Sequence, residues 1–109
     1  SFLDINPSTE GMTLVITKDH KRSDVFKNAD EEIEELMLAS KKVSQMLMKA
    51  LPIERVGLIF EGVEVPHLHA KLIPIKNGEN IRILLNSNFA KPSQETLQKT
   101  AEKIRRFDM

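Results

Sequence analysis

The sequence contains no cysteine, tryptophan or tyrosine, and apart from histidine its only aromatic residues are five phenylalanines. Without cysteine the chain cannot form a disulfide, a thiolate metal site or a cysteine nucleophile. A surface that stacks nucleic-acid bases would have to use phenylalanine or aliphatic side chains. These absences exclude disulfide-stabilised and thiol-dependent classes of protein.

An excess of charge of one sign is also lacking, because 16 Lys and Arg balance 16 Asp and Glu to a formal net charge of +0. Proteins that bind long nucleic acid usually carry a strong basic excess, so we do not expect such a partner. A small anionic ligand needs only a few local donors.

Long hydrophobic runs are missing as well. No stretch approaches the roughly 18 consecutive apolar residues of a membrane span, and the first residues lack the basic and apolar regions of a signal peptide. We therefore expect no membrane partner and a cytoplasmic location. The length of 109 residues is enough for one core, which predicts a single domain over residues 1–109.

Short runs rich in β-branched and apolar residues predict strands. They lie at residues 2–5, 13–17, 55–60, 67–73 and 81–85. Helical spacing of apolar residues predicts a long helix over 30–51, which Asp30 can cap, and a final helix that opens at Ser93 and ends at Arg105 and Arg106. The order of these elements favours an α+β fold with a mostly antiparallel sheet.

The segment at 67–73 carries the most informative pattern. In a strand, His67, His69 and Lys71 point to one face, and the apolar residues between them point to the other. Burying three unpaired nitrogen groups would be costly, whereas an open face could present them to an anion. Imidazole is a nucleophile near neutral pH and a neighbouring cation can hold phosphate oxygens, so the row suits phosphate chemistry.

Two other interpretations compete with phosphate chemistry. The strand could simply be half-exposed, with two histidines and a lysine on its polar face. Alternatively, His67 and His69 could bind a metal, with Glu64 or His20 as a third ligand. Lys71 on the same face would place a positive charge beside that ion, which favours phosphate over metal.

The residues of this segment resemble the signature of the histidine triad (HIT) family of nucleotide hydrolases and transferases. That signature is His-φ-His-φ-His-φ-φ, where φ is apolar, and residues 67–73 read His-Leu-His-Ala-Lys-Leu-Ile, followed by Pro74. Residues 2–7 and 11–20 resemble the family's strand, turn, strand and additional histidine in the same order. The resemblance covers residues 2–74 and implies the HIT-like fold.

The resemblance also implies roles for single residues. His69 would attack the α-phosphate of a nucleotide and form a nucleotidyl-histidine intermediate that water hydrolyses, with no cofactor or metal required. His67 would orient His69, and His20 would help to order this network. Asp4 would accept hydrogen bonds from ribose hydroxyls, and an apolar slot for the base would be formed by Phe2, Leu3 and Ile5.

The implied substrate is a purine nucleotide conjugate, such as a dinucleoside polyphosphate or a nucleoside phosphoramidate. The implied assembly is a homodimer through the helix at 30–51 and the strand at 55–60. Methionines of that helix, Met37, Met46 and Met48, could equally be ordinary core residues.

The sequence departs from the family pattern at three places. Lys71 replaces the third histidine, and an ammonium group is a poor acid at neutral pH, so protonation of the leaving group would change. Glu64 lies near where a hydroxyl often meets the phosphate in the family. A carboxylate there would repel an anion unless it turns away or pairs with Lys71. Family members usually carry an N-terminal helix and hairpin ahead of this strand, and the sequence begins almost at Phe2, so either the form is naturally short or its start is missing. These departures keep open an alternative, a nucleotide-binding protein with weak or lost catalysis.

Overall fold

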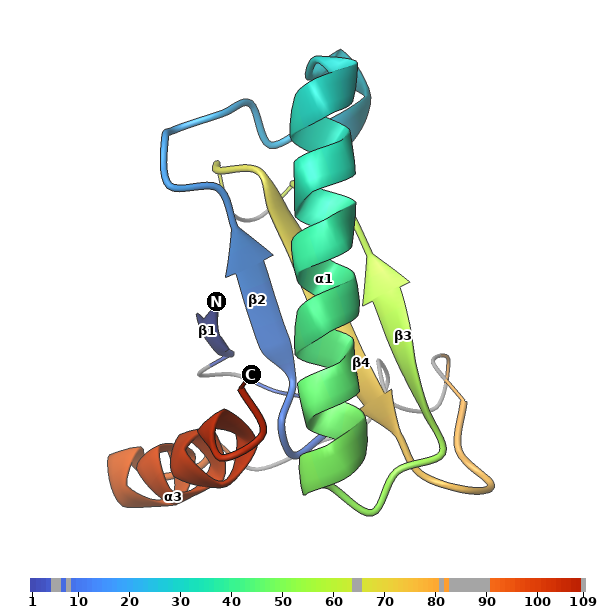
Figure 1. Cartoon of the computed structure of the whole chain (residues 1–109), viewed down its shortest axis with the longest axis vertical. Helices are drawn as coiled ribbons and strands as arrows, with labels where there is room; N and C mark the ends of the chain where they lie inside the picture. The colour runs from blue at the N-terminus through green and yellow to red at the C-terminus, as the bar shows by residue number, and fades with distance from the viewer. Residues whose placement is uncertain (5–6, 8, 64–65, 81, 83–90, 109) are drawn as a thin grey trace.

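A computed structural model describes residues 1–4, 7, 9–63, 66–80, 82 and 91–108. Its centre is a four-stranded sheet crossed by one long helix, with a second helix beside it (Figure 1). The strands occur in the spatial order β1-β2-β4-β3, and every neighbouring pair is antiparallel. The predicted α+β class with an antiparallel sheet is therefore confirmed. The elements are β1 (Phe2–Leu3), β2 (Thr13–Ile16), a 3-10 turn (Val25–Lys27), α1 (Asp30–Ala50), β3 (Arg55–Ile59), β4 (His69–Ile75) and α3 (Gln94–Arg105).

The strand register assigns side chains to the two faces of the sheet. Directly opposed residues of an antiparallel pair point to the same face. Leu14 of β2 is opposite Phe2 on one side and Lys71 on the other, and Lys71 is also opposite Ile59. These four side chains therefore share a face, which also carries His69 because it lies two residues from Lys71. We call it the histidine face.

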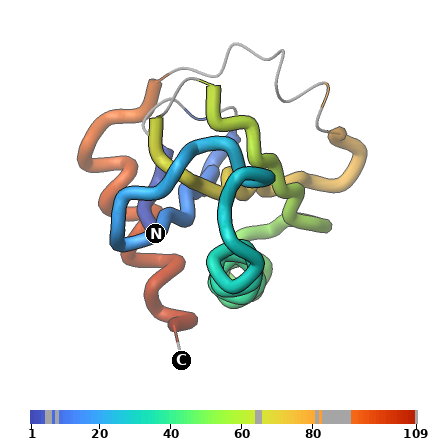
Figure 2. The backbone as a smooth tube through the Cα atoms, turned by 90° about the horizontal axis from the view of Figure 1, so that it is seen from above, coloured from blue at the N-terminus to red at the C-terminus, as the bar shows by residue number. Residues whose placement is uncertain are grey.

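The other face of the sheet packs against α1 and forms the main core. Figure 2 views α1 nearly end-on and shows it against one side of the strands. The core residues from the sheet and from α1 are buried, and Leu47, Leu68 and Ala70 have no exposed surface. A smaller apolar cluster of Met12 and Ile73 is buried on the histidine face. The helix thus fixes β4, and β4 positions the functional side chains.

The start and end of β4 differ from the prediction. The strand begins at His69 rather than His67, and it continues through Pro74 to Ile75. Glu54 donates its N–H to the carbonyl of Ile75, so the backbone of Pro74 points the opposite way, toward β2. The β2 ladder starts only at Thr13 opposite Leu72, so the nitrogen of Pro74 is not required for a ladder bond there.

The helix ends agree with the prediction except at one position. Residue Ala29 is the N-cap of α1 and makes no side-chain cap, so Asp30 is the first helical residue rather than the cap. Ser93 does cap α3, because its hydroxyl accepts the N–H of Thr96 at 3.1 Å. The strand expected at 81–85 lies outside the described residues except for Arg82.

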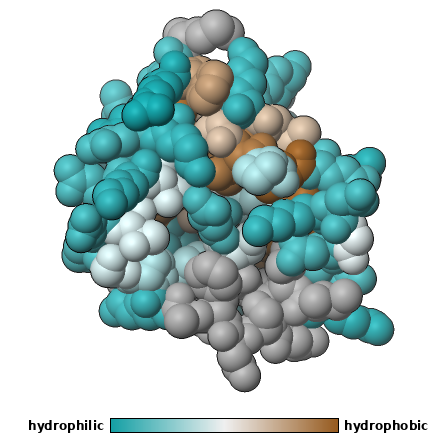
Figure 3. Space-filling model, turned by 90° about the horizontal axis from the view of Figure 1, so that it is seen from below, coloured by the Kyte–Doolittle hydropathy of each residue, from teal (hydrophilic) through white to brown (hydrophobic). Residues whose placement is uncertain are grey.

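The surface of α1 is partly apolar. Met46 packs against the core, whereas Met37 is 43% exposed, Leu38 68% and Met48 42%. Viewed from the end where α1 finishes, the molecule shows hydrophobic atoms at its surface between hydrophilic ones (Figure 3). In the part of the chain that the structure describes, no helix has the length and apolar character to cross a membrane.

Candidate functional site

The chain has three histidines, and the structure brings all three to the same end of the sheet. His69 is the first residue of β4 and lies opposite Ile16, near the end of β2. His67 precedes it by two residues, and His20 follows β2 on the neighbouring segment. The ring centroids of His20 and His67 are 5.2 Å apart, with the ring planes at 83°.

The ring of His69 is held in one tautomer by the backbone just before β4. Its Nδ1 lies 2.9 Å from the carbonyl oxygen of His67, and a carbonyl only accepts, so Nδ1 must carry the proton. In the neutral ring, Nε2 then carries the lone pair. His69 is only 5% exposed, which differs from the open position expected from the sequence. Its burial is tolerated because the polar nitrogen is hydrogen-bonded.

The ring of His67 is anchored to the end of β2. Its Nε2 lies 3.0 Å from the carbonyl oxygen of Thr17 and 3.3 Å from the Thr17 hydroxyl. That hydroxyl donates its proton to the carbonyl of Asp19 at 2.7 Å, so it accepts from Nε2–H. These bonds hold the backbone of His67, and thus the carbonyl that orients His69.

The segment after β2 is tied to both sides of the site. The carbonyl of Lys21 accepts the N–H of Leu68 at 3.2 Å. The Lys21 ammonium lies 2.9 Å from Glu32 in the first turn of α1, and the hydrogen bond and charge of Glu32 raise the pKa of Lys21 above its usual value. This stabilising effect is present at neutral pH and is lost only as the pH rises through the raised pKa.

Lys71, at the third position of the row, meets Asp4 across β2. Lys71 Nζ is 3.9 Å from Asp4 Oδ2, and the two side chains are 26% and 13% exposed. This distance is longer than a hydrogen bond, so the attraction is coulombic. The structure thus pairs Lys71 with Asp4. The other partner considered for it, Glu64, lies outside the described residues.

The three residues expected to line the base slot do not share one face. Phe2 is on the histidine face and 49% exposed. Leu3 is opposite Thr13 and packs against the main core, so it points the other way. Ile5 lies outside the described residues. Leu14, which lies between Phe2 and Lys71 in register, places an apolar side chain beside Phe2 on the histidine face.

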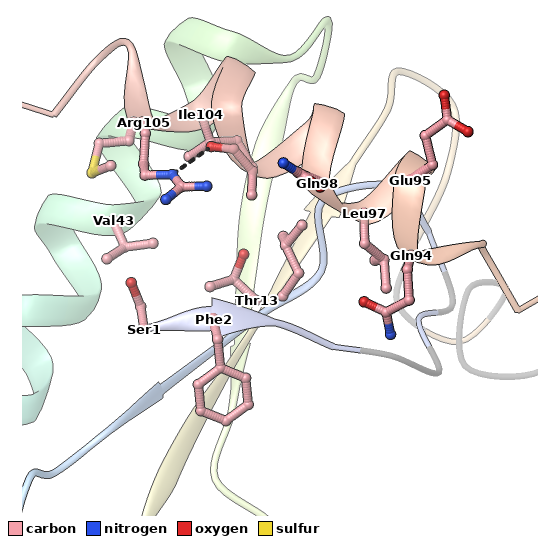
Figure 4. A pocket seen from close by; sticks show the side chains of 13 residues that line it. Ser1, Phe2, Thr13, Val43, Gln94, Glu95, Leu97, Gln98, Ile104 and Arg105 are labelled. Carbon is pink, nitrogen blue, oxygen red and sulfur yellow. Dashed lines mark hydrogen bonds between the residues drawn. The ribbon is translucent and has the colours of Figure 1, made fainter.

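A cavity of about 800 Å³ lies between β1, α1 and α3, on the helix side of the sheet. Figure 4 shows Val43, Leu97 and Ile104 around it, with the ring of Phe2 on the far side of β1 from α3. None of the three histidines lines it. The chemistry-bearing groups lie instead around His69, which is therefore the candidate active site.

Comparison with known proteins agrees with this location. A family model of the HIT domain matches residues 1–78, which include the whole of β4 and all three histidines. The chain belongs to the HIT family. Two solved HIT proteins share its fold with a TM-score of 0.78 each. One is a hypothetical histidine triad nucleotide-binding protein from Sulfolobus tokodaii, 25% identical, covering 95% of this chain and 73% of that one. The other is a Hit-like protein involved in cell-cycle regulation from Bartonella henselae, 27% identical, covering 95% and 75%.

A zinc-bound histidine triad protein from Mycobacterium smegmatis has the same fold, with a TM-score of 0.72 and 23% identity over 97% of this chain and 77% of that one. In this HIT domain, the described residues include no group of three His, Asp or Glu side chains arranged to hold a metal ion. His67 and His69 each direct one ring nitrogen to a backbone carbonyl. Glu64, which was one of the two residues predicted as a third metal ligand beside His67 and His69, lies outside the described residues.

Two residues that contribute to the site of this HIT domain were not identified from its sequence. Thr17 anchors His67 through its backbone and hydroxyl, and Leu14 lies in register between Phe2 and Lys71. An antiparallel pairing of 13–17 with 67–73 would have suggested both. The sequence predicts the two strands but not their register.

Proposed function

We propose that this HIT protein hydrolyses a nucleotide conjugate at its α-phosphate through a nucleotidyl intermediate on His69. The observation that carries the proposal is the hydrogen bond from His69 Nδ1 to the carbonyl of His67. It leaves the lone pair on Nε2, directs the ring and prepares it for attack. Family membership supports the same class of reaction.

Two steps complete the reaction. The Nε2 lone pair of His69 attacks the α-phosphorus, an N–P bond forms, and the bond to the leaving group breaks with its electron pair. The ring becomes positively charged, which strengthens its Nδ1–H bond to the His67 carbonyl. Water then attacks phosphorus, the N–P electron pair returns to Nε2, and the water proton passes to solvent with release of the nucleoside monophosphate.

The nucleotide is proposed to lie across the histidine face. Asp4 would accept from the ribose, and Phe2 with Leu14 would contact the base, which we propose to be a purine. The description of the Sulfolobus tokodaii relative as a nucleotide-binding protein supports this ligand class. His20, whose ring is edge-on to that of His67, would support the orientation of the triad.

The release of AMP from diadenosine tetraphosphate tests the proposal. Purified protein, free of added metal, should release AMP with multiple turnovers, and a chromatographic assay of the products measures it. Binding of the nucleotide by calorimetry without any release of AMP would favour the alternative, a nucleotide-binding protein without catalysis.

Substitution of His67 tests its positioning role. His67→Leu should lower kcat by about 10- to 100-fold, with KM changed less than about threefold, because the carbonyl that orients His69 loses its anchor. Thr17→Val is the matched control, since the Thr17 carbonyl still accepts from His67, and its kcat should stay within about threefold of wild type. Equal losses in the two variants would contradict the role of this anchor.

Two further predictions concern the setting of the protein. A homodimer through α1 and β3 is supported by the exposed Met37, Leu38 and Met48 and by the position of β3 at the edge of the sheet. The mass in solution tests it. A cytoplasmic location stays a prediction from the sequence.

A further inference from the structure

The third position of the row holds a cation that the fold fixes in place. Lys71 and His69 share a face of β4 at two-residue spacing, about 6 to 7 Å apart along the strand. The side chain of Lys71 is 26% exposed, and its Nζ lies 3.9 Å from Oδ2 of Asp4, on the other side of β2. The Asp4 side chain is 13% exposed, and the attraction between the two opposite charges holds the ammonium group near that carboxylate.

A fixed ammonium group and an imidazole assist different leaving groups. When a phosphoanhydride is cleaved, the electron pair of the breaking P–O bond goes to the leaving phosphate, which departs as an anion and needs charge stabilisation. When a phosphoramidate is cleaved, the pair goes to nitrogen, which must take up a proton to leave as an amine. Imidazolium can donate that proton at neutral pH, whereas an ammonium group holds its proton well above it.

We propose that Lys71 restricts this site to nucleoside polyphosphates and dinucleoside polyphosphates, whose leaving group is a phosphate. The same residue disfavours the cleavage of nucleoside phosphoramidates. Asp4 is the positioning residue for Lys71, because it holds the ammonium over the histidine face. The inference rests on the proposed function and names its substrate class.

The test compares two substrates with the same AMP moiety, diadenosine tetraphosphate and an adenosine 5′-phosphoramidate of an alkylamine. The wild-type chain should show kcat/KM at least about 100-fold higher for the polyphosphate. Lys71→His should shift this ratio at least about tenfold toward the phosphoramidate. Lys71→Met should lower polyphosphate turnover by about 100-fold, while Lys71→Arg, which keeps the charge, should lower it by less than about tenfold.

The outcomes separate the two proposals. Equal kcat/KM for both substrates in the wild type, or an unchanged ratio in Lys71→His, would overturn the role of Lys71 and leave the hydrolase proposal standing. If AMP is released from neither substrate, both the hydrolase proposal and the role of Lys71 are contradicted. The wild-type ratio needs no variant, so misfolding of Lys71→Met cannot hide the answer.

Discussion

Substitution of His69 by glutamine should lower the kcat/KM for diadenosine tetraphosphate by at least about 10⁴-fold. An amide has no lone pair of comparable nucleophilicity, so the covalent route closes. Glutamine has a similar volume and can still donate to the carbonyl of His67, so the buried position, 5% exposed in the wild type, should remain filled. The rate of AMP release, measured with a thermal unfolding curve for each variant, checks the prediction.

Two controls distinguish chemistry from folding in this experiment. Lys99→Ala changes an exposed residue of α3, with a side chain 75% exposed, and should leave the rate unchanged. His69→Gly should be inactive but should regain part of its turnover when imidazole is added, because the small molecule can replace the missing nucleophile. A His69→Gln variant that keeps more than about a tenth of the wild-type rate would contradict the nucleophilic role.

Substitution of Gly62 by alanine should destabilise the protein by about 2 to 4 kcal/mol, a fall in Tm of about 10 °C or more. Gly62 has a φ of +73°, and a Cβ there would overlap the backbone carbonyl of Ser23. Backbone cannot move aside as a flexible side chain can. Because the 19–24 segment also carries His20 and the Lys21 carbonyl that binds Leu68, turnover should fall as well.

Gly78→Ala is the matched control for this substitution. Gly78 also has a positive φ, +87°, but a Cβ there would meet nothing within 4 Å. It should cost only the backbone strain, about 1 kcal/mol. Differential scanning calorimetry of both variants isolates the steric part. Equal Tm values for Gly62→Ala and Gly78→Ala would contradict the expected steric clash between a side chain at position 62 and the Ser23 backbone.

Local patterns in the sequence were sufficient for the elements that carry the site. Alternation of side chains around His69 and the three- and four-residue apolar spacing after Asp30 predict β4 and α1 within two residues at each end. The capping role of Ser93 is confirmed because a cap depends only on residues within one turn. Local chemistry therefore sufficed for these elements, although it placed the N-cap of α1 at Asp30, one residue after the observed cap, Ala29.

Contacts between distant segments could not be derived in this way. The pairing of Lys71 with Asp4 depends on the register of three strands. The anchor of His67 on Thr17 depends on how β2 ends beside β4. A proline such as Pro74 is typical of a strand end, and only the tertiary structure shows that its nitrogen lies where no ladder hydrogen bond is needed. The burial of His69 likewise follows from packing around the sheet.

The most direct measurement is the mass of the protein caught during a single turnover. Enzyme in excess over diadenosine tetraphosphate would be quenched rapidly at alkaline pH, where a phosphorus–nitrogen bond to imidazole survives, and the digested peptides would be sequenced by mass spectrometry. We predict that each modified chain carries a single adenylyl group, on His69. Release of AMP with no adduct on His69, or with the adduct on another residue, would contradict the account.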